Sequence, residues 1–176
     1  MWPDITGWLV AKMNANRDHP AIKRYREAQW ALVIPFFGLG WTYGFLEDFR
    51  ELVGRGGPWD FKNTVSFESR HCPTRDCQRT VTLCGLCVDY DVAGNIHYGW
   101  VGRAADLRRW FLLWRAAKAQ KGGVDPDHDV VAIKIGMDMW DTKNRSLCHH
   151  VRKHAASLNY GKNNRAKDCA PCNERL

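Results

Sequence analysis

The chain has 176 residues, of which 45% are hydrophobic, 12% aromatic and 26% charged. This composition is typical of one globular domain with its own core, and it excludes a disordered or low-complexity chain. A formal net charge of +7 and a pI near 9.2 predict attraction to polyanions: nucleic acid, an anionic bacterial wall or a membrane surface.

Three helices are predicted in the N-terminal third, over residues 5–16, 21–32 and 42–53, because apolar residues recur there at helical spacing. Asp4 or Thr6 can cap the first of them. These helices are expected to be packing elements.

An uncharged run covers residues 30–46 and contains one proline and three glycines. These breaks favour a buried helix and turn over a membrane segment, so no stable membrane span is expected. In the helix that follows, Glu47 and Glu51 fall opposite the apolar face. We therefore expect both to be solvated rather than catalytic.

Residues 54–62, Gly-Arg-Gly-Gly-Pro-Trp-Asp-Phe-Lys, close that helix with glycine. They present Trp59, Asp60 and Lys62 on a tight turn. An acid and a base beside an aromatic residue suit either a salt-bridged structural turn or the rim of an active site.

A small β-hairpin or sheet is predicted at about residues 64–92, where apolar and polar residues alternate. Four of the chain's cysteines lie in this range. The seven cysteines are Cys72, Cys77, Cys84, Cys87, Cys148, Cys169 and Cys172. The first four have a spacing that could bind zinc, or they could form disulfides in an oxidising compartment. We favour disulfides, because the odd seventh cysteine fits no complete second metal site.

The stretch 84–103 is predicted to carry the site, at the point where a β-rich run passes into a helix. Its chemistry-bearing side chains are Asp91, Asn95, His97, Tyr98 and Trp100. Gly94, Gly99 and Gly102 are expected to allow turn conformations at a pocket wall. The alternative is an ordinary glycine-rich turn in which His97 is merely hydrogen-bonded in the interior.

The C-terminal half continues with a helix over residues 104–121, whose tryptophans are expected in the core and whose arginines form a solvated face. Residues 122–129 predict a loop and a helix start, and capping alone could explain their aspartates. Residues 131–139 alternate as a strand would, but this start signal favours helix. A basic helix is predicted over residues 142–158.

These patterns predict an α+β fold, mostly α-helical with the small hairpin, in one compact domain over residues 1–158. Residues 159–176 are expected to be a basic, cysteine-containing tail packed on that domain. Residues 1–6 lack the basic start and apolar core of a secretion signal. The protein is therefore expected either to stay inside the cell or to be a module cut from a longer exported one.

Four segments in order resemble the polymorphic toxin type 44 family. They are residues 8–14, the Gly-Gly-Pro-Trp-Asp-Phe-Lys run at 56–62, the stretch 91–104, and Asp-Pro-Asp with Ile-x-Ile-Gly-Met within 125–137. The resemblance implies a toxin domain at the C-terminal end of a larger exported polypeptide, made with an immunity protein. Related secreted domains look like cell-wall muramidases, and family-level predictions also speak of nucleases.

The leading hypothesis is a hydrolase of the peptidoglycan glycan strand, exported to act in the target-cell periplasm. Such chemistry needs two carboxyl groups about 5 to 9.5 Å apart across the scissile bond. Asp60 and Asp91 are the candidates because both lie in the specific motifs, and Glu68 is the reserve for the acid.

The neighbouring side chains would bind the sugar. His97 and Tyr98 would hold it or tune a carboxyl pKa, and Asn95 would bond an N-acetyl group. Trp59 and Trp100 would stack on pyranose faces. No metal or other cofactor is assigned.

The rival hypothesis is a toxin nuclease, under which nucleic acid would be the substrate. His97 would act as general base, and Lys62 or Arg103 would stabilise the charge of the phosphorane. No metal-nuclease motif is recognisable. A pore former built on residues 30–46 and a zinc-dependent binding module are further alternatives.

Overall fold

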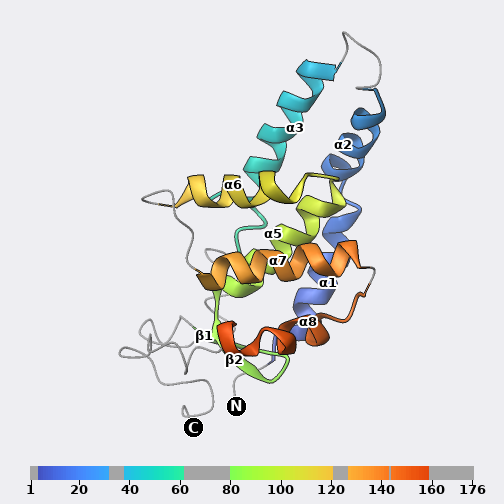
Figure 1. Cartoon of the computed structure of the whole chain (residues 1–176). Coiled ribbons are helices and arrows are strands. Elements are labelled where there is room, and N and C mark those ends of the chain that lie inside the picture. Colours follow the sequence, from blue (N-terminus) through green and yellow to red (C-terminus); the bar gives the residue numbers. More distant parts are fainter. Residues whose placement is uncertain (1–3, 32–37, 62–79, 121–126, 143, 159–176) are drawn as a thin grey trace.

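Two helices, α5 (Asp91–Ala104) and α7 (Asp127–Asp141), cross at the centre of the molecule (Figure 1). The computed structural model describes residues 4–31, 38–61, 80–120, 127–142 and 144–158. Glycine permits the close crossing: a methyl group at Gly99 would overlap the carbonyl oxygen of Ile133, and one at Gly136 would overlap that of Ile96. The two backbones are therefore in contact.

The prediction that glycines in 84–103 make turns is wrong for α5, which is one continuous helix. Gly99 serves close approach between helices rather than an unusual backbone conformation. Gly102 lies against the side chain of Leu112 in the same way. The glycines that do have positive φ are Gly56 and Gly85, in the flanking turns.

The first helix, α1 (Thr6–Arg17), packs on α5. The indole of Trp100 is 2% exposed, and its Nε1 donates to the carbonyl oxygen of Met13 at 3.0 Å. The Arg145 guanidinium lies 4.6 Å from the Trp100 ring centre and 4.7 Å from that of Trp140. This arginine thus covers the edge of the α5–α7 crossing.

Two helices, α2 (Pro20–Ala31) and α3 (Gly38–Val53), lie side by side and extend away from the crossing (Figure 1). In the part of the chain that the structure describes, no helix is both long and apolar enough to cross a membrane. Helix α6 (Arg109–Ala119) follows α5, beginning later than the predicted residue 104, which belongs to α5.

The predicted hairpin is confirmed over its described part. Strands β1 (Thr80–Leu83) and β2 (Leu86–Asp89) pair antiparallel, with Val81 opposite Val88. The N-terminal segment joins them, because the Ile5 amide donates to the Thr82 carbonyl at 2.9 Å. Val81 and Val88 face the core, which includes Ile5.

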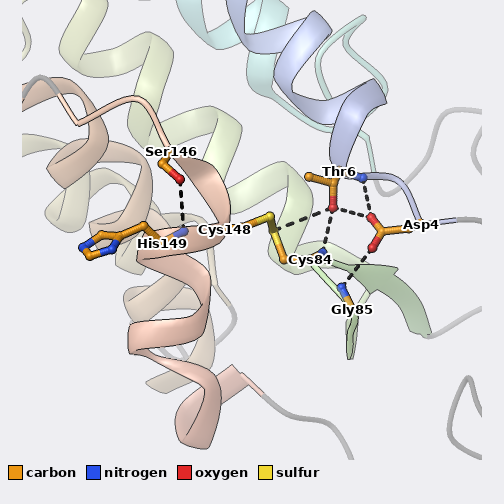
Figure 2. Close-up of a disulfide and its surroundings, with 7 residues drawn as sticks. All are labelled: Asp4, Thr6, Cys84, Gly85, Ser146, Cys148 and His149. Atoms are coloured by element: carbon orange, nitrogen blue, oxygen red, sulfur yellow. Dashed lines mark hydrogen bonds between the residues drawn. A yellow bond between two sulfur atoms is a disulfide. The ribbon is translucent and has the colours of Figure 1, made fainter.

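A disulfide joins Cys84 at the hairpin turn to Cys148 (Figure 2). Around it, the Thr6 hydroxyl accepts from the Cys84 amide at 2.7 Å and itself donates to Asp4. Asp4 also accepts from the Gly85 amide at 2.9 Å. Burial opposes charge on Asp4, but the hydrogen bonds from Thr6 and Gly85 outweigh it, so the pKa of this carboxyl is lowered. Hairpin and helix α1 are thereby tied together.

The C-terminal segment forms two short helices, α8 (Leu147–Lys153) and α9 (Ala155–Leu158). The predicted single helix over residues 142–158 is therefore wrong. Helix α8 begins after Ser146, whose hydroxyl oxygen accepts a hydrogen bond from the His149 amide, as a helix cap does (Figure 2). Residues 131–139 are helical, as the start signal predicted.

The mostly helical fold with a two-stranded antiparallel sheet confirms the predicted fold class. One hydrophobic cluster extends from Ile5 to Leu158. The disulfide confirms the preference for disulfides at Cys84, which in this form is no thiolate ligand. Cys72, Cys77 and the tail 159–176 lie outside the described residues.

Candidate functional site

A cleft of about 790 Å³ opens between α3, residues 54–61, α5 and α6. One part of its wall is aromatic. The ring-bearing residues that line it are Phe49, Trp59, Phe61, Tyr98, Phe111 and Trp114. Tyr98 is held in place because its hydroxyl donates to the Leu112 carbonyl at 3.1 Å. Tyr98, Phe111 and Trp114 are at least partly exposed and can offer flat apolar faces to a sugar ring or a base, whereas Phe49, Trp59 and Phe61 are buried.

The polar part of the wall combines acids, bases and two amides. It consists of Glu47, Arg50, Arg55, Asp60, Asn95, Arg115 and Gln120. Arg50 lies 3.3 Å from a carboxylate oxygen of the exposed Glu47. The guanidinium groups of this wall suit an anionic substrate.

Asp60 is positioned by the turn that follows α3. The Trp59 amide donates to the Leu52 carbonyl at 2.8 Å, and the Asp60 amide donates to Gly57 at 3.0 Å. Asp60 Oδ2 in turn accepts from the Gly56 amide at 2.9 Å, and Gly56 has a φ of 81°, which glycine adopts without strain. The turn thus presents a carboxyl group with a defined orientation.

His97 lies behind this turn rather than in the cleft. Its ring is fully buried, 4.6 Å from the Phe61 ring and 5.4 Å from the Trp59 ring, centre to centre. Its Nε2 is 2.9 Å from the Asn16 amide nitrogen on α1, so Nε2 accepts and the imidazole is neutral. No described residue hydrogen-bonds Nδ1.

Burial lowers the pKa of His97 to about 3, with a smaller effect from the charge of Lys12. The imidazole of His97 is therefore uncharged near neutral pH. In this structure His97 packs against the Trp59 and Phe61 side chains of the cleft wall, and its part in a reaction stays a prediction.

The N-terminal turns of α5 and α7 bring a second polar group together. Asn95 donates from Nδ2 to Asp129 Oδ1 at 2.7 Å. The same oxygen lies 3.2 Å from His128 Nε2, which is 3.8 Å from Asp91 Oδ1. His128 and Asp129 are buried, whereas Asn95 reaches the cleft. A polar chain of close contacts therefore leads from the cleft through Asn95 and Asp129 to His128, and Asp91 lies 3.8 Å beyond it.

The same cluster contains the residues that could hold a metal ion. Asp89, Asp91 and His128 each offer one ligand atom, and these atoms lie within 4.8 Å of one another. Carboxylate and imidazole ligands of this kind suit a divalent cation.

The structure brings four of the predicted site residues to the cleft: Trp59, Asp60, Asn95 and Tyr98. Asp91 lies one helical turn before Asn95 and joins the cleft only through the polar chain. Lys62 and Glu68 lie outside the described residues, so their part in the site stays a prediction.

Two other predicted residues lie in the α5–α7 scaffold. Trp100 is buried against Met13 and cannot offer a face to a sugar in this conformation. Arg103 pairs through Nε with Asp141 at 2.8 Å and donates to the Leu107 carbonyl. Both side chains hold helices together, which is the ordinary role for a buried indole and a paired guanidinium.

Sequence reasoning missed most of the cationic wall and half of the polar cluster. Arg50 lies in α3 and Arg55 lies within the glycine turn, and neither was assigned to the site. The aspartates of residues 122–129 were explained by capping alone and His128 was given no role, although a histidine between two aspartates in the sequence is more than a cap requires.

No curated protein and no solved structure shows significant similarity to this chain. A family model does: the one described as bacterial toxin 44 matches residues 48–142, more than half of the chain. The match covers the cleft turn, α5, α6 and α7. Such a family implies a toxin effector domain and a cognate immunity protein. The chain therefore belongs to the bacterial toxin 44 family.

Proposed function

We propose that this toxin domain hydrolyses the glycan strand of peptidoglycan in the cleft between α3, α5 and α6. The observation that carries the proposal is the composition of the cleft. It joins an aromatic wall to an oriented carboxyl group, Asp60, and to a buried polar cluster that Asn95 contacts. Glycoside hydrolysis needs those parts: two carboxyl groups and surfaces on which sugars stack.

In this scheme Asp91, whose side chain is partly exposed at the end of the cluster, gives its proton directly to the leaving oxygen. His128 lies between the two carboxyl groups of the cluster, with Nε2 3.2 Å from Asp129 Oδ1 and 3.8 Å from Asp91 Oδ1. Asp60 acts from the other side of the bond, as nucleophile or as the base that activates water. Asn95 binds the sugar and connects it to Asp129.

The disulfide supports a site of action outside the cytosol. Such bonds persist in oxidising compartments, including the bacterial periplasm, where the wall lies. The positive net charge also favours an anionic wall polymer. Export to the target-cell periplasm is part of the proposal.

The test is incubation of the purified protein with isolated peptidoglycan sacculi, followed by mass spectrometry of the soluble products. Wild-type protein should release muropeptides, and the product masses give the bond that is cut. Asp60→Asn and Asp91→Asn should each lower the rate roughly 10²–10⁴-fold, because each removes a proton-transfer or nucleophilic group. Glu51→Gln is the matched control, since Glu51 is exposed and does not line the cleft.

Muropeptide release that both aspartate variants retain would overturn the site assignment. Absence of release by folded, oxidised wild-type protein would overturn the glycan hydrolase proposal itself. Circular dichroism of each variant separates loss of chemistry from loss of fold.

A nuclease is the second candidate, favoured by the arginines of the cleft and by the Asp89, Asp91 and His128 ligand set. Under it, His128 would help to hold the metal ion, and the general-base role that sequence reasoning gave to His97 would not be filled by that ring, which is buried and neutral. RNA and DNA degradation that chelator abolishes and Asp91→Asn removes would support this candidate; degradation without muropeptide release would replace the first.

A further inference from the structure

Two tryptophans of α6 are exposed although most large apolar side chains of the described residues are not. Trp110 is 63% exposed and Trp114 is 47% exposed. By contrast, Trp59 and Trp100 are buried. An exposed pair of indoles leaves large apolar surfaces in water, and such surfaces commonly mark binding sites.

The two indoles lie one behind the other on the same face of α6. Their separation of four positions corresponds to roughly 6 Å along the helix axis. Phe111 contacts both, with ring centres 5.9 Å from each. Phe111 and Trp114 line the cleft, whereas Trp110 does not. These three residues form an aromatic strip that leads from the cleft onto the outer surface.

Positive charge accompanies the aromatic strip. The Arg115 guanidinium lies 5.9 Å from the centre of the Trp114 ring. Lys118, also exposed, follows Trp114 by one turn on the same face. Flat apolar faces beside cations suit a sugar chain that carries carboxylates, as peptidoglycan does.

We propose that Trp110 and Trp114 form a glycan-binding subsite at the outer end of the cleft, where the peptidoglycan strand continues beyond the scissile bond. The nature of the occupant rests on the proposed function. The aromatic strip itself is continuous with the cleft, so a strand bound across Asp60 can extend along α6. The rise between the two indoles is comparable to that of one pyranose in an extended strand.

The experiment measures binding to isolated sacculi by co-sedimentation in the Asp60→Asn background, in which substrate is not consumed. Adding Trp110→Ala should weaken binding about tenfold, because one stacking face is lost. Trp110→Phe should restore most of it. Lys134→Ala, an exposed substitution on α7, is the surface control and should leave binding unchanged.

A kinetic measurement in the otherwise wild-type protein complements the binding assay. Trp110→Ala should raise KM for sacculi about tenfold and leave kcat unchanged, since Trp110 does not line the cleft. Unchanged sacculus binding and KM in both Trp110→Ala and Trp114→Ala would overturn the subsite. Muropeptide release by the wild type in that case would leave the proposed function standing.

The opposite combination of results, binding without muropeptide release, also distinguishes the two proposals. If wild-type protein releases no muropeptides but sacculus binding still depends on Trp110, the proposed function fails and the aromatic strip stands as a wall-binding surface. Trp110-dependent binding of single-stranded RNA, with none to sacculi, would overturn the glycan assignment. So would a dimer in light scattering that Trp110→Ala dissociates, because the strip would then be covered by a second copy.

Discussion

The two faces of α5 differ in how much space their neighbours leave. Toward α7, Gly99 lies against backbone, and any added atom meets the Ile133 carbonyl. Toward the cleft, a methyl group at Gly94 would meet only the Phe61 side chain, at 3.9 Å. Asn95 and Tyr98 share this open face. One helix therefore supplies a tightly packed scaffold on one face and polar groups for chemistry on the other.

This difference separates residues that hold the fold from residues that could act on a substrate. Trp100 and Arg103 point into packing contacts, although they belong to the same motif as Asn95 and Tyr98. A motif that spans a whole helix therefore contains both packing residues and residues that could act on a substrate. The face of the helix on which a residue lies distinguishes the two.

The largest effect is expected at the glycine crossing. Gly99→Ala should destabilise the protein by about 3 kcal/mol or more, or prevent folding, because the backbones of α5 and α7 must separate. Gly94→Ala, five positions earlier, should be neutral or stabilise by up to about 1 kcal/mol, since alanine is the better helix former. Urea denaturation of both variants checks this, and equal effects would contradict the comparison.

A smaller effect should follow loss of the disulfide. Cys84→Ser with Cys148→Ser should lower the free energy of unfolding by about 2–4 kcal/mol, because the bond closes a chain separation of 64 residues. Thermal denaturation with and without reductant measures it. Reductant should bring wild-type protein to the Tm of the variant and leave the variant unchanged; a further drop in the variant would point to other cysteines.

His97 should make stability depend on pH. Above pH 6.5 the imidazole is neutral in both states and contributes no such dependence. Below pH 6.5 the His97 ring takes up a proton in the unfolded chain, whereas in the native state the ring stays neutral until the pH falls to about 3. The free energy of unfolding should therefore fall with acidification, by roughly 2 kcal/mol between pH 6.5 and 5 from this group.

His97→Gln keeps a polar partner for Asn16 but does not titrate, so its loss of stability over that range should be smaller by a similar amount. His149→Gln is the control, because His149 is exposed. Urea titrations at pH 7.5, 6 and 5 compare the three proteins. Identical pH dependence in wild type and His97→Gln would show that the buried ring does not govern it.

The smallest effect is expected at the outer edge of the crossing. Arg145→Ala should cost about 1 kcal/mol, because it removes the guanidinium between the Trp100 and Trp140 rings. Arg145→Lys should recover part of that loss. Muropeptide release should be the same in both variants, since Arg145 does not line the cleft; a catalytic defect in folded protein would mean that scaffold and cleft are coupled.

Much of the secondary structure could be predicted from sequence. Helical spacing indicated α1, α2, α3 and α6, the alternation of apolar and polar residues indicated the β-hairpin, and glycine marked the turn after α3. Two predictions failed where local signals were ambiguous. Glycines within α5 suggested turns, since a helix tolerates glycine poorly unless a neighbour needs the space. The start of α8 was predicted too early, at residue 142 instead of Leu147, because residues 142–146 carry no proline or glycine.

The candidate site was predicted less completely than the fold. Asp60, Asn95 and Tyr98 were recognised because they stand in compact motifs, and the structure places all three at the cleft. His128 and Asp129 were not, because their role depends on the meeting of two helix ends that are more than 30 residues apart in sequence.

By itself, the sequence determined the class of fold, the family motifs and the chemistry available near Asp60 and Asp91, because those follow from local spacing and residue type. Only the tertiary structure decided that His97 pairs with Asn16, that Cys84 joins Cys148, and that Asn95 meets Asp129. The physical reason is that each of these contacts depends on how whole helices pack. A spacing pattern records which face of a helix is apolar, but not which other element covers that face.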